Sequence, residues 1–331
     1  MNRYGLILLV WLFSYGAMAA DETQRFHLVV VSGDYDSPQG TSMRLWAKLV
    51  DERSQGRLSI NVFYQNELGG QQEIFDQLLK GNLHMVLAWP QTAYDQRMGV
   101  SFLPYLTIGW DDALAAYARD GWLTQVVAGV YAENGLKYFG PYPEGFGGIA
   151  TKGRYTTSID NTAGIKLRSQ TIFPLPQTIS AMGFDAVPID WSEVYTSLQT
   201  GVVDGDSSNV IYWDYEYFGD LLDYFVHTKH NFSAAALVMN NEVWLNLSDA
   251  DKQIFEDTAD IVIRKQFADA KTEDDKWIAT AQANGMAYFV PNTAEMQSWV
   301  RTVRDKVWPQ AETFLGPAIM QTVRDNASVP E

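Results

Sequence analysis

Apolar and polar residues alternate along the first third of the chain with a period that switches between that of a strand and that of a helix. Residues 26–32 (FHLVVVS) are a short run of strand formers, and residues 38–53 place Trp46 and Val50 on one apolar helical face. An alternating strand, a helix and an apolar strand follow, at residues 58–62, 71–80 and 83–88. This order predicts a largely parallel sheet that is covered by helices.

A second set of elements follows the glycine- and proline-rich residues 141–154 (PYPEGFGGIATKGR), where we expect the chain to cross between two domains. The chain then turns extended again between Val226 and Met239. The expected elements between these points are a strand, a helix, a strand, a helix and a strand, at residues 164–169, 174–182, 186–189, 191–200 and 201–205. The repeated alternation predicts a second α/β lobe.

One short pattern occurs twice, at residues 70–89 and at residues 190–209. Each copy has a helix-capping position, a glutamate three residues later and a glycine that suits the left-handed end of a helix. The shared positions are Glu73 with Glu193 and Gly81 with Gly201. We interpret both glutamates as capping residues that bond back to the cap amide, and the duplication as a sign of two similar lobes.

Residues 248–284 contain neither proline nor glycine. Ser248 and Asp251 form a capping pair at the start, and Gly285 follows the end. A continuous helix of this length would run about 54 Å, which is long enough to lie across both lobes. A strand at residues 286–290 and an amphipathic helix with Trp299 complete the chain.

The N-terminus, residues 1–20, has the pattern of a secretory signal peptide. Arg3 precedes an apolar run at residues 6–13, and small residues end the segment. The apolar run is shorter than the roughly 20 residues that a membrane-spanning helix needs. Because the chain has no cysteine for lipid attachment or disulfides, we expect the signal peptide to be removed and the mature protein to be free in a Gram-negative periplasm.

Charge and motif content narrow the class of function. The formal net charge of −16 argues against binding to nucleic acid and to anionic lipid. Four histidines are few for an enzyme of this length, and His227 and His230 lie three residues apart in an extended stretch, on opposite faces. We find no nucleophile elbow, phosphate loop or zinc motif, so the sequence predicts a protein that is no enzyme and needs no cofactor or metal.

Arg168 is the candidate for ligand binding that the residues themselves suggest. In the strand GIKLRS, Lys166 and Arg168 face away from Ile165 and Leu167, and Arg168 lies near the carboxyl end of the strand. Open α/β sheets place ligands at that end, and a guanidinium binds a carboxylate through two parallel hydrogen bonds. The alternative interpretation is a salt bridge to one of the 40 acidic residues.

The segments GRLSINVFYQNELGG, GIKLRS and DWSEVYTSLQTGVVDG resemble the DctP family of TRAP transporter substrate-binding proteins, in matching order over nearly all of the mature chain. The resemblance implies an α/β fold of two lobes, joined by hinge strands and spanned by a long helix, which closes over an organic acid. It implies delivery to a sodium-driven TRAP membrane permease, and Arg168 as the carboxylate ligand. We expect a monomer with lobe I at residues 21–145 plus 232–275 and lobe II at residues 146–231 plus 276–331.

Departures from the family pattern predict the ligand class. Gly148 stands where many acidic-sugar binders carry a second arginine, and Trp89 and Trp191 stand at positions that face the ligand. One cation between two tryptophans indicates a monocarboxylate with a ring or an apolar body. Ser207 and Ser208, which replace part of the family's ENP triplet, are expected to receive one polar substituent.

Three further residues complete the candidate ligand contacts. Tyr195 and Trp213 have packing as their first interpretation, because eleven tryptophans cannot all face one small cavity. Arg154 matches a family arginine, for which a structural or hinge role and a ligand contact both stay open.

Four alternatives to this function remain. The ligand can be a zwitterionic compatible solute such as ectoine, which an acidic group facing its cation would favour, or a keto or sugar acid. The protein can be a sensor module that signals to a membrane receptor, or a secreted hydrolase that uses Asp204 or Asp206. A structure in which an internal acid fully engages Arg168, with no cavity beside it, would contradict the ligand-binding hypothesis.

Overall fold

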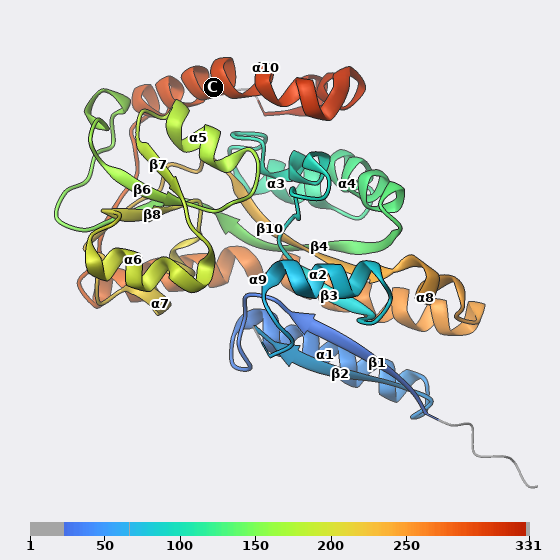
Figure 1. The fold of residues 1–331 in the computed structure, drawn as a ribbon. Helices are drawn as coiled ribbons and strands as arrows, with labels where there is room; N and C mark the ends of the chain where they lie inside the picture. Colours follow the sequence, from blue (N-terminus) through green and yellow to red (C-terminus); the bar gives the residue numbers. More distant parts are fainter. Residues whose placement is uncertain (1–22, 66, 329–331) are drawn as a thin grey trace, which may run out of the picture.

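The computed structural model describes residues 23–65 and 67–328, so the predicted signal peptide lies outside the described residues. Figure 1 shows a two-lobed α/β protein in which each lobe is built on its own sheet. This confirms the fold class predicted from the sequence. Within the described ranges, no helix is both long enough and apolar enough to cross a lipid bilayer.

The first sheet has five strands in the order β2-β1-β3-β10-β4. Its parallel part consists of three strands, and β10 pairs antiparallel with both β3 and β4. The prediction of a largely parallel sheet is therefore confirmed for the three strands from which it was made, and β10 runs against the direction of the other four strands. The strands are β1 (Gln24–Val30), β2 (Leu58–Tyr64), β3 (Met85–Ala88), β4 (Leu136–Phe146) and β10 (Phe232–Asn240).

Both faces of this sheet are covered, as its run of consecutive apolar residues requires. Neighbouring residues Leu28 and Val29 point to opposite faces of β1, and both are fully buried, in two different apolar clusters. The covering elements are α1 (Pro38–Arg53), α2 (Gln71–Leu79), η1 (Gln96–Phe102), α3 (Trp110–Tyr117), α4 (Trp122–Glu133) and α8 (Asn241–Leu245).

The second sheet has six strands in the order β11-β9-β5-β8-β6-β7. Parallel pairing joins β8, β6 and β7, so that their carboxyl ends meet at one edge. The strands are β5 (Ile149–Thr151), β6 (Lys166–Ser169), β7 (Asp185–Pro188), β8 (Gly205–Ser207), β9 (Tyr224–Val226) and β11 (Ala287–Phe289). The helices of this part of the chain are η2 (Ile159–Asn161), α5 (Leu175–Ala181), η3 (Trp191–Glu193), α6 (Val194–Thr200) and α7 (Ile211–Phe218).

Two adjacent segments carry the chain between the sheets. Residues 147–148 connect β4 to β5, and residues 227–231 connect β9 to β10. The amide of Gly147 donates to the carbonyl oxygen of Asn231, and its own carbonyl oxygen accepts from the amide of Lys229. The two crossings therefore run side by side, and the first lies in the segment where the sequence predicts a crossing.

Two long helices also join the lobes. Helix α9 (Asp249–Ala283) begins at Ser248, whose side chain accepts from the amide of Asp251, which confirms the predicted long helix and its cap. Figure 1 shows α9 extending across the molecule from one lobe to the other. In α10 (Thr293–Asn326), residues near Trp299 pack on the second sheet, whereas Leu315 and its neighbours join a cluster of the first sheet. The predicted boundaries end the first lobe at residue 275 and so assign Leu315 to the second lobe, although it packs in a cluster of the first sheet. These boundaries stay a prediction.

The repeated pattern forms a helix in both lobes, with one difference from expectation. Gly81 and Gly201 adopt left-handed backbone angles, with φ of 73° and 76°, as predicted. Asp190 caps its helix by accepting from the amide of Ser192. The side chains of Glu73 and Glu193 make no hydrogen bond to the cap amides in the described structure, so the capping interpretation of these two glutamates is wrong.

Candidate ligand-binding site

Arg168 lies on β6, and the register of the sheet decides its first partner. Strand β6 pairs in parallel with β8, which sets residue 168 opposite Asp206. Nη1 of Arg168 donates to Oδ1 of Asp206 over 3.2 Å, and Nε donates to the carbonyl oxygen of Ile189 over 3.0 Å. Both side chains of the ion pair are buried. The salt-bridge interpretation of Arg168 is therefore confirmed.

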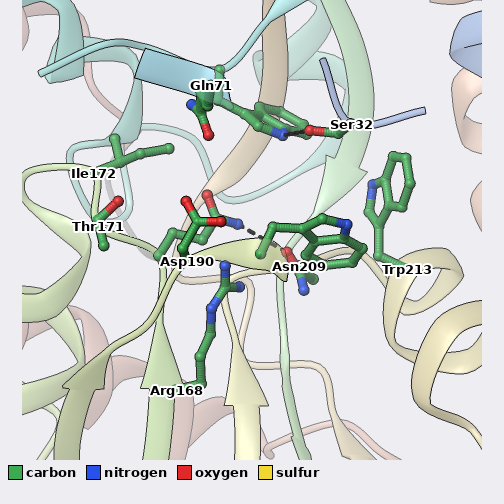
Figure 2. A pocket seen from close by; sticks show the side chains of 11 residues that line it. Ser32, Gln71, Arg168, Thr171, Ile172, Asp190, Asn209 and Trp213 are labelled. Atoms are coloured by element: carbon green, nitrogen blue, oxygen red, sulfur yellow. Dashed lines mark hydrogen bonds between the residues drawn. The ribbon is translucent and has the colours of Figure 1, made fainter. Parts of the chain in front are cut away.

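A cavity lies beside the same guanidinium, within about 450 Å³ of empty space that includes open solvent, so the salt bridge does not close the site. Figure 2 shows Arg168 pointing from its strand toward this cavity, with Asp190 and Asn209 nearby and Ser32 and Gln71 on the opposite side. The first lobe supplies Ser32, Gln71 and Trp89, and the second supplies Arg168, Gln170, Thr171, Ile172, Asp190, Trp191, Asn209 and Trp213. The lining from both lobes is the arrangement that lobe closure requires.

Three tryptophans give the cavity flat apolar walls. Trp89 follows β3 and is held by a hydrogen bond from its Nε1 to the hydroxyl of Ser32, 2.8 Å away. Trp191 contacts Trp213 edge to face, with ring centroids 5.7 Å apart. The guanidinium carbon of Arg168 lies 5.8 Å from the ring centroid of Trp191. The positive group therefore lies next to an aromatic wall.

A chain of hydrogen bonds behind Arg168 fixes the orientation of two amides. The amide nitrogen of Asn209 donates to Asp206 and to Asp214, over 2.9 and 3.1 Å. Its oxygen must then face Gln170, whose Nε2 donates to it over 2.8 Å. Oε1 of Gln170 is left buried and without a hydrogen-bond partner among the described residues. Because Gln170 lines the cavity, the cavity wall carries an acceptor that lacks a donor.

Two buried acids near Arg168, Asp206 and Asp214, both have raised pKa values, and they differ in the charges that act on them. Burial raises the pKa of Asp214 well above its usual range, and the nearby charge of Asp206 raises it further. Burial also raises the pKa of Asp206, but the positive charge of Arg168 opposes that rise. The protonated form is therefore favoured more strongly at Asp214 than at Asp206, which has Arg168 beside it.

The cavity opens to the surface through a wider groove between the lobes, with a volume of about 1410 Å³. Glu73 and Asp76 of α2 line one side of this groove, and Asp190 lines the other. Arg168 and every other lysine or arginine of the described chain are absent from the lining of the groove. A ligand with several negative charges would meet electrostatic repulsion on this path.

Four predicted ligand residues lie away from the cavity wall. The hydroxyl of Ser207 donates to the carbonyl oxygen of Arg168, and Ser208 pairs with His230 over 2.9 Å. Tyr195 is exposed, and its hydroxyl bonds to Asp220. Arg154 is exposed as well and bonds to the carbonyl oxygen of Gly164. The structure thus brings together Arg168, Trp89, Trp191 and Trp213, and gives the other four structural contacts.

Several lining residues went unrecognised in the sequence, although a signal for them exists. Ser32 follows β1, and Gln170 and Thr171 follow β6, so they lie at the carboxyl ends of parallel strands. Ligands bind at such ends in open α/β sheets, and extending the rule from Arg168 to its neighbours finds them. Asp190 was predicted only as a helix cap, but it caps the helix and lines the cavity as well.

The histidines and acids of the described chain form no metal site. No group of three or more histidine, aspartate or glutamate side chains is arranged to hold a metal ion in the described residues. His227 bonds to Tyr288, and His230 bonds to Thr228 and Ser208. Asp206, one of the two candidates for a hydrolase, is fully buried against Arg168. These contacts explain these three side chains as structural.

Comparison with known proteins agrees with this geometry. Residues 31–313 match the model of DctP, described as bacterial extracellular solute-binding protein, family 7. The chain is 28% identical over 205 residues to the ectoine-binding periplasmic protein TeaA of Halomonas elongata, a match that covers 61% of this chain and 60% of that protein. It is 26% identical over 308 residues to a solute-binding protein of Verminephrobacter eiseniae, covering 92% and 90% of the two chains.

A solved structure shares the fold. The TRAP periplasmic solute-binding protein of Desulfovibrio salexigens with bound orotic acid superposes with a TM-score of 0.83 at 18% identity. The superposition covers 91% of this chain and 97% of that one. The two-lobed architecture is therefore that of solved periplasmic binding proteins.

Proposed function

This chain belongs to the DctP family, family 7 of the bacterial extracellular solute-binding proteins, and on that premise we propose that it captures a small organic monocarboxylate with a flat or apolar body. The lobes close over the ligand, and the closed form delivers it to the membrane subunits of a TRAP transporter. The protein performs no bond chemistry. The predicted signal peptide directs the protein to the periplasm and is then removed. We propose that the mature protein acts there as a monomer.

The observation that carries this proposal is the single guanidinium beside an aromatic cavity. Arg168 uses Nε and Nη1 for internal hydrogen bonds, and neither bond involves Nη2. The charge of Arg168 is already balanced by Asp206. A ligand carboxylate would therefore gain a charge-assisted hydrogen bond to Arg168, but it would not meet an unpaired cation. Trp89, Trp191 and Trp213 offer the rest of the ligand stacking and edge contacts.

A second requirement comes from Gln170. Its Oε1 is a buried acceptor on the cavity wall with no partner among the described residues, and leaving such a group unpaired costs about 1–3 kcal/mol. A ligand with a hydroxyl or N–H group close to its carboxylate would satisfy this oxygen. The polar substituent predicted to meet Ser207 and Ser208 is therefore assigned to Gln170 instead.

The acidic groove favours one negative charge over two. A dicarboxylate would pass Glu73, Asp76 and Asp190 and would then find Arg168 as the only arginine or lysine on the cavity wall. Its second carboxylate would lose hydration without gaining a counter-ion. We therefore place succinate-like acids outside the ligand class.

Thermal unfolding of the mature protein with three acids tests the proposal. Mandelate has a ring, one carboxylate and a hydroxyl; phenylacetate lacks the hydroxyl; succinate has two carboxylates and no ring. We expect the midpoint temperature to rise most with mandelate, less with phenylacetate and not with succinate. Arg168→Ala should stay folded and lose the response to mandelate. A rise with succinate alone, or an unchanged mandelate response in Arg168→Ala, would contradict the proposal.

A zwitterionic solute is the second candidate, and Asp190 favours it. The carboxylate of Asp190 lines the cavity that Arg168 also lines, so the lining carries both a negative and a positive charge, which suits a zwitterionic ligand. The relative TeaA is named as ectoine-binding. Ectoine in the same unfolding assay decides between the two. A larger midpoint rise with ectoine than with mandelate, lost in Asp190→Asn, would favour the zwitterion.

A further inference from the structure

A second cavity lies behind Trp213 and outside the ligand site described above, within about 380 Å³ of empty space that includes open solvent. Trp213 is the one residue that lines both cavities. The walls come from the start of α1, from β4, from α7 with the residue before it, and from α9. The lining residues are Pro38, Gln39, Tyr142, Glu144, Val210, Tyr212, Trp213, Gln266, Glu273, Asp274 and Trp277.

Helix α9 lines this cavity with acidic side chains, whereas the buried face of a helix is usually apolar. Gln266, Glu273 and Trp277 lie seven and eleven residues apart, a spacing that places them on one face of a helix. Asp274 lies beside them and is only 6% exposed. With Glu144 of β4, three carboxyl groups line one cavity, and none of its lining residues is a lysine or an arginine.

The internal hydrogen bonds satisfy only part of this polar lining. Glu144 accepts from Gln39 over 2.7 Å, from Trp213 over 3.0 Å and from Ser233 over 3.5 Å. The side chain of Asp274 has no hydrogen-bond partner among the described residues. Oε1 of Gln39, a residue 2% exposed, also lacks a partner there. A buried carboxyl group and a buried amide oxygen that lack donors call for a ligand that supplies hydrogen-bond donors or positive charge.

Aromatic rings supply the other half of a cation site. The ring centroid of Tyr212 lies 4.8 Å from that of Trp213 and 4.8 Å from that of Trp277. These three rings and Tyr142 border the same cavity as the acids. Aromatic faces attract cations, most strongly where water is excluded. Rings together with carboxylates recognise an organic ammonium group better than they recognise a neutral ligand.

The cavity has a route to the surface that does not pass the main site. A groove of about 1010 Å³ shares Pro38, Tyr212, Gln266, Glu273 and Trp277 with it. Asp34, Asp36 and Glu216 also line this groove, with Lys265 and Lys276 as its basic residues. A cation can therefore enter along acidic residues between α1, α7 and α9.

We propose that the cavity around Glu144 and Asp274 is a second binding site, for a small organic ammonium ion. Glu144 and Asp274 pair with the positive nitrogen, Gln39 accepts from it, and the rings of Trp213 and Trp277 cover its apolar groups. Gln39 belongs to α1 of the first lobe, and Trp213 belongs to α7 of the second lobe. An ion bound between them would therefore hold the lobes together. This site is independent of the function proposed for the Arg168 cavity.

Binding at this site would release protons. Burial raises the pKa of Glu144 to about 7 and that of Asp274 to about 7. The charged groups that act on them are Glu273 on Glu144, and Asp275, Lys229 and Lys271 on Asp274. An ammonium ion favours the ionised carboxylates, so its affinity should rise with pH through about 7.

The test uses choline and ethanolammonium as probes, with isothermal titration and thermal unfolding of the mature protein at constant ionic strength. The neutral control is dimethylbutanol, in which carbon replaces the charged nitrogen of choline. We expect at least one of the two cations to bind at about pH 8, at least about tenfold more weakly at about pH 5.5, and dimethylbutanol to show no comparable binding. Absence of binding by both cations at about pH 8, or equal binding of the neutral analogue, would overturn the proposal.

Variants locate the bound cation. Glu144→Gln and Asp274→Asn should each weaken it at least about tenfold. Asp249→Asn is the matched control, because Asp249 is an exposed acid of the same helix, pairs with Lys252 and does not line the cavity; it should bind normally. Arg168→Ala should also bind the cation normally, which separates this site from the acid site. Binding that survives both Glu144→Gln and Asp274→Asn but is lost in Trp89→Ala would place the cation in the main cavity and refute the proposal.

Discussion

Nη1 of Arg168 lies 3.2 Å from Oδ1 of Asp206, at a position where two parallel strands set the two residues opposite each other. In the proposed complex, the ligand carboxylate would therefore meet an arginine that already has a counter-ion. This arrangement keeps the cation buried in the unliganded protein without the cost of an isolated charge. It also limits the affinity that the guanidinium contributes, so the ligand must gain the rest from its body and its donor group.

Asp206→Asn should destabilise the protein and increase its response to ligand. Removing one partner of a buried ion pair leaves the other charge uncompensated, at a cost of about 3 kcal/mol. In the variant, the ligand carboxylate becomes a counter-ion of Arg168, and ligand-induced stabilisation should exceed that of the wild type. Urea unfolding with and without mandelate measures both effects. Asp185→Asn, at an exposed position of β7, should match the wild type. A neutral effect of Asp206→Asn would show that Asp206 does not balance Arg168.

Gln170→Leu should remove the preference for a ligand with a hydrogen-bond donor. The wild type is expected to bind mandelate about two- to tenfold more tightly than phenylacetate, since one satisfied hydrogen bond contributes about 0.5–1.5 kcal/mol. Leucine has no acceptor, so the two acids should bind the variant almost equally. Isothermal titration of both acids with both proteins gives the coupling directly. An unchanged preference in Gln170→Leu would assign the donor contact to another residue.

The sequence predicts the elements better than it predicts the contacts between them. Periodicity and caps are local properties, so the long helix from Ser248 and the strand that carries Arg168 were predictable. The antiparallel strand β10 was not, because strand order depends on pairing between residues far apart in the chain.

The candidate site shows the same division. Arg168 was found from residue type and position, Trp89 and Trp191 were found from the resemblance to the DctP family, and all three line one cavity. The roles of Ser207 and Ser208 depended on side-chain direction, and both hydroxyls turn to internal partners. The acceptor on Gln170 follows from a hydrogen-bond chain through Asn209, which no sequence pattern records.

The free energy of unfolding should fall as pH rises from about 4.5 to about 7, in part because of Glu144. Burial raises the pKa of Glu144 from its ordinary 4.5 to about 7. Within that window the folded protein keeps a proton that the unfolded chain has lost, so each pH unit removes up to about 1.4 kcal/mol.

Glu144→Gln should reduce this slope without abolishing it, because Asp274 also has a raised pKa of about 7. Urea unfolding of both proteins across the window measures the slopes. Glu52→Gln, an exposed acid on α1, serves as the control and should leave the slope as in the wild type. Parallel curves for the wild type and Glu144→Gln would show that Glu144 titrates alike in the folded and unfolded chains.

Gly147 lies in the crossing between the lobes, and we expect that this position cannot accept a residue with a side chain without a shift of the backbone. A Cβ at this position would lie 2.3 Å from Oδ1 of Asn231 and 2.7 Å from the carbonyl oxygen of Ser208. The second contact is with backbone, so Gly147→Ala must move one crossing strand away from its neighbours, at about 1–3 kcal/mol. Gly129→Ala is the matched control: it lies on α4 with nothing within 4 Å of the added carbon, and alanine should stabilise that helix by about 0.5–1 kcal/mol. Urea unfolding compares the two variants with the wild type.

Because the crossing is where the lobes turn, Gly147→Ala should also weaken mandelate binding, which Gly129→Ala leaves unchanged. Equal stability of Gly147→Ala and the wild type would mean that the crossing tolerates a shift larger than its close packing implies.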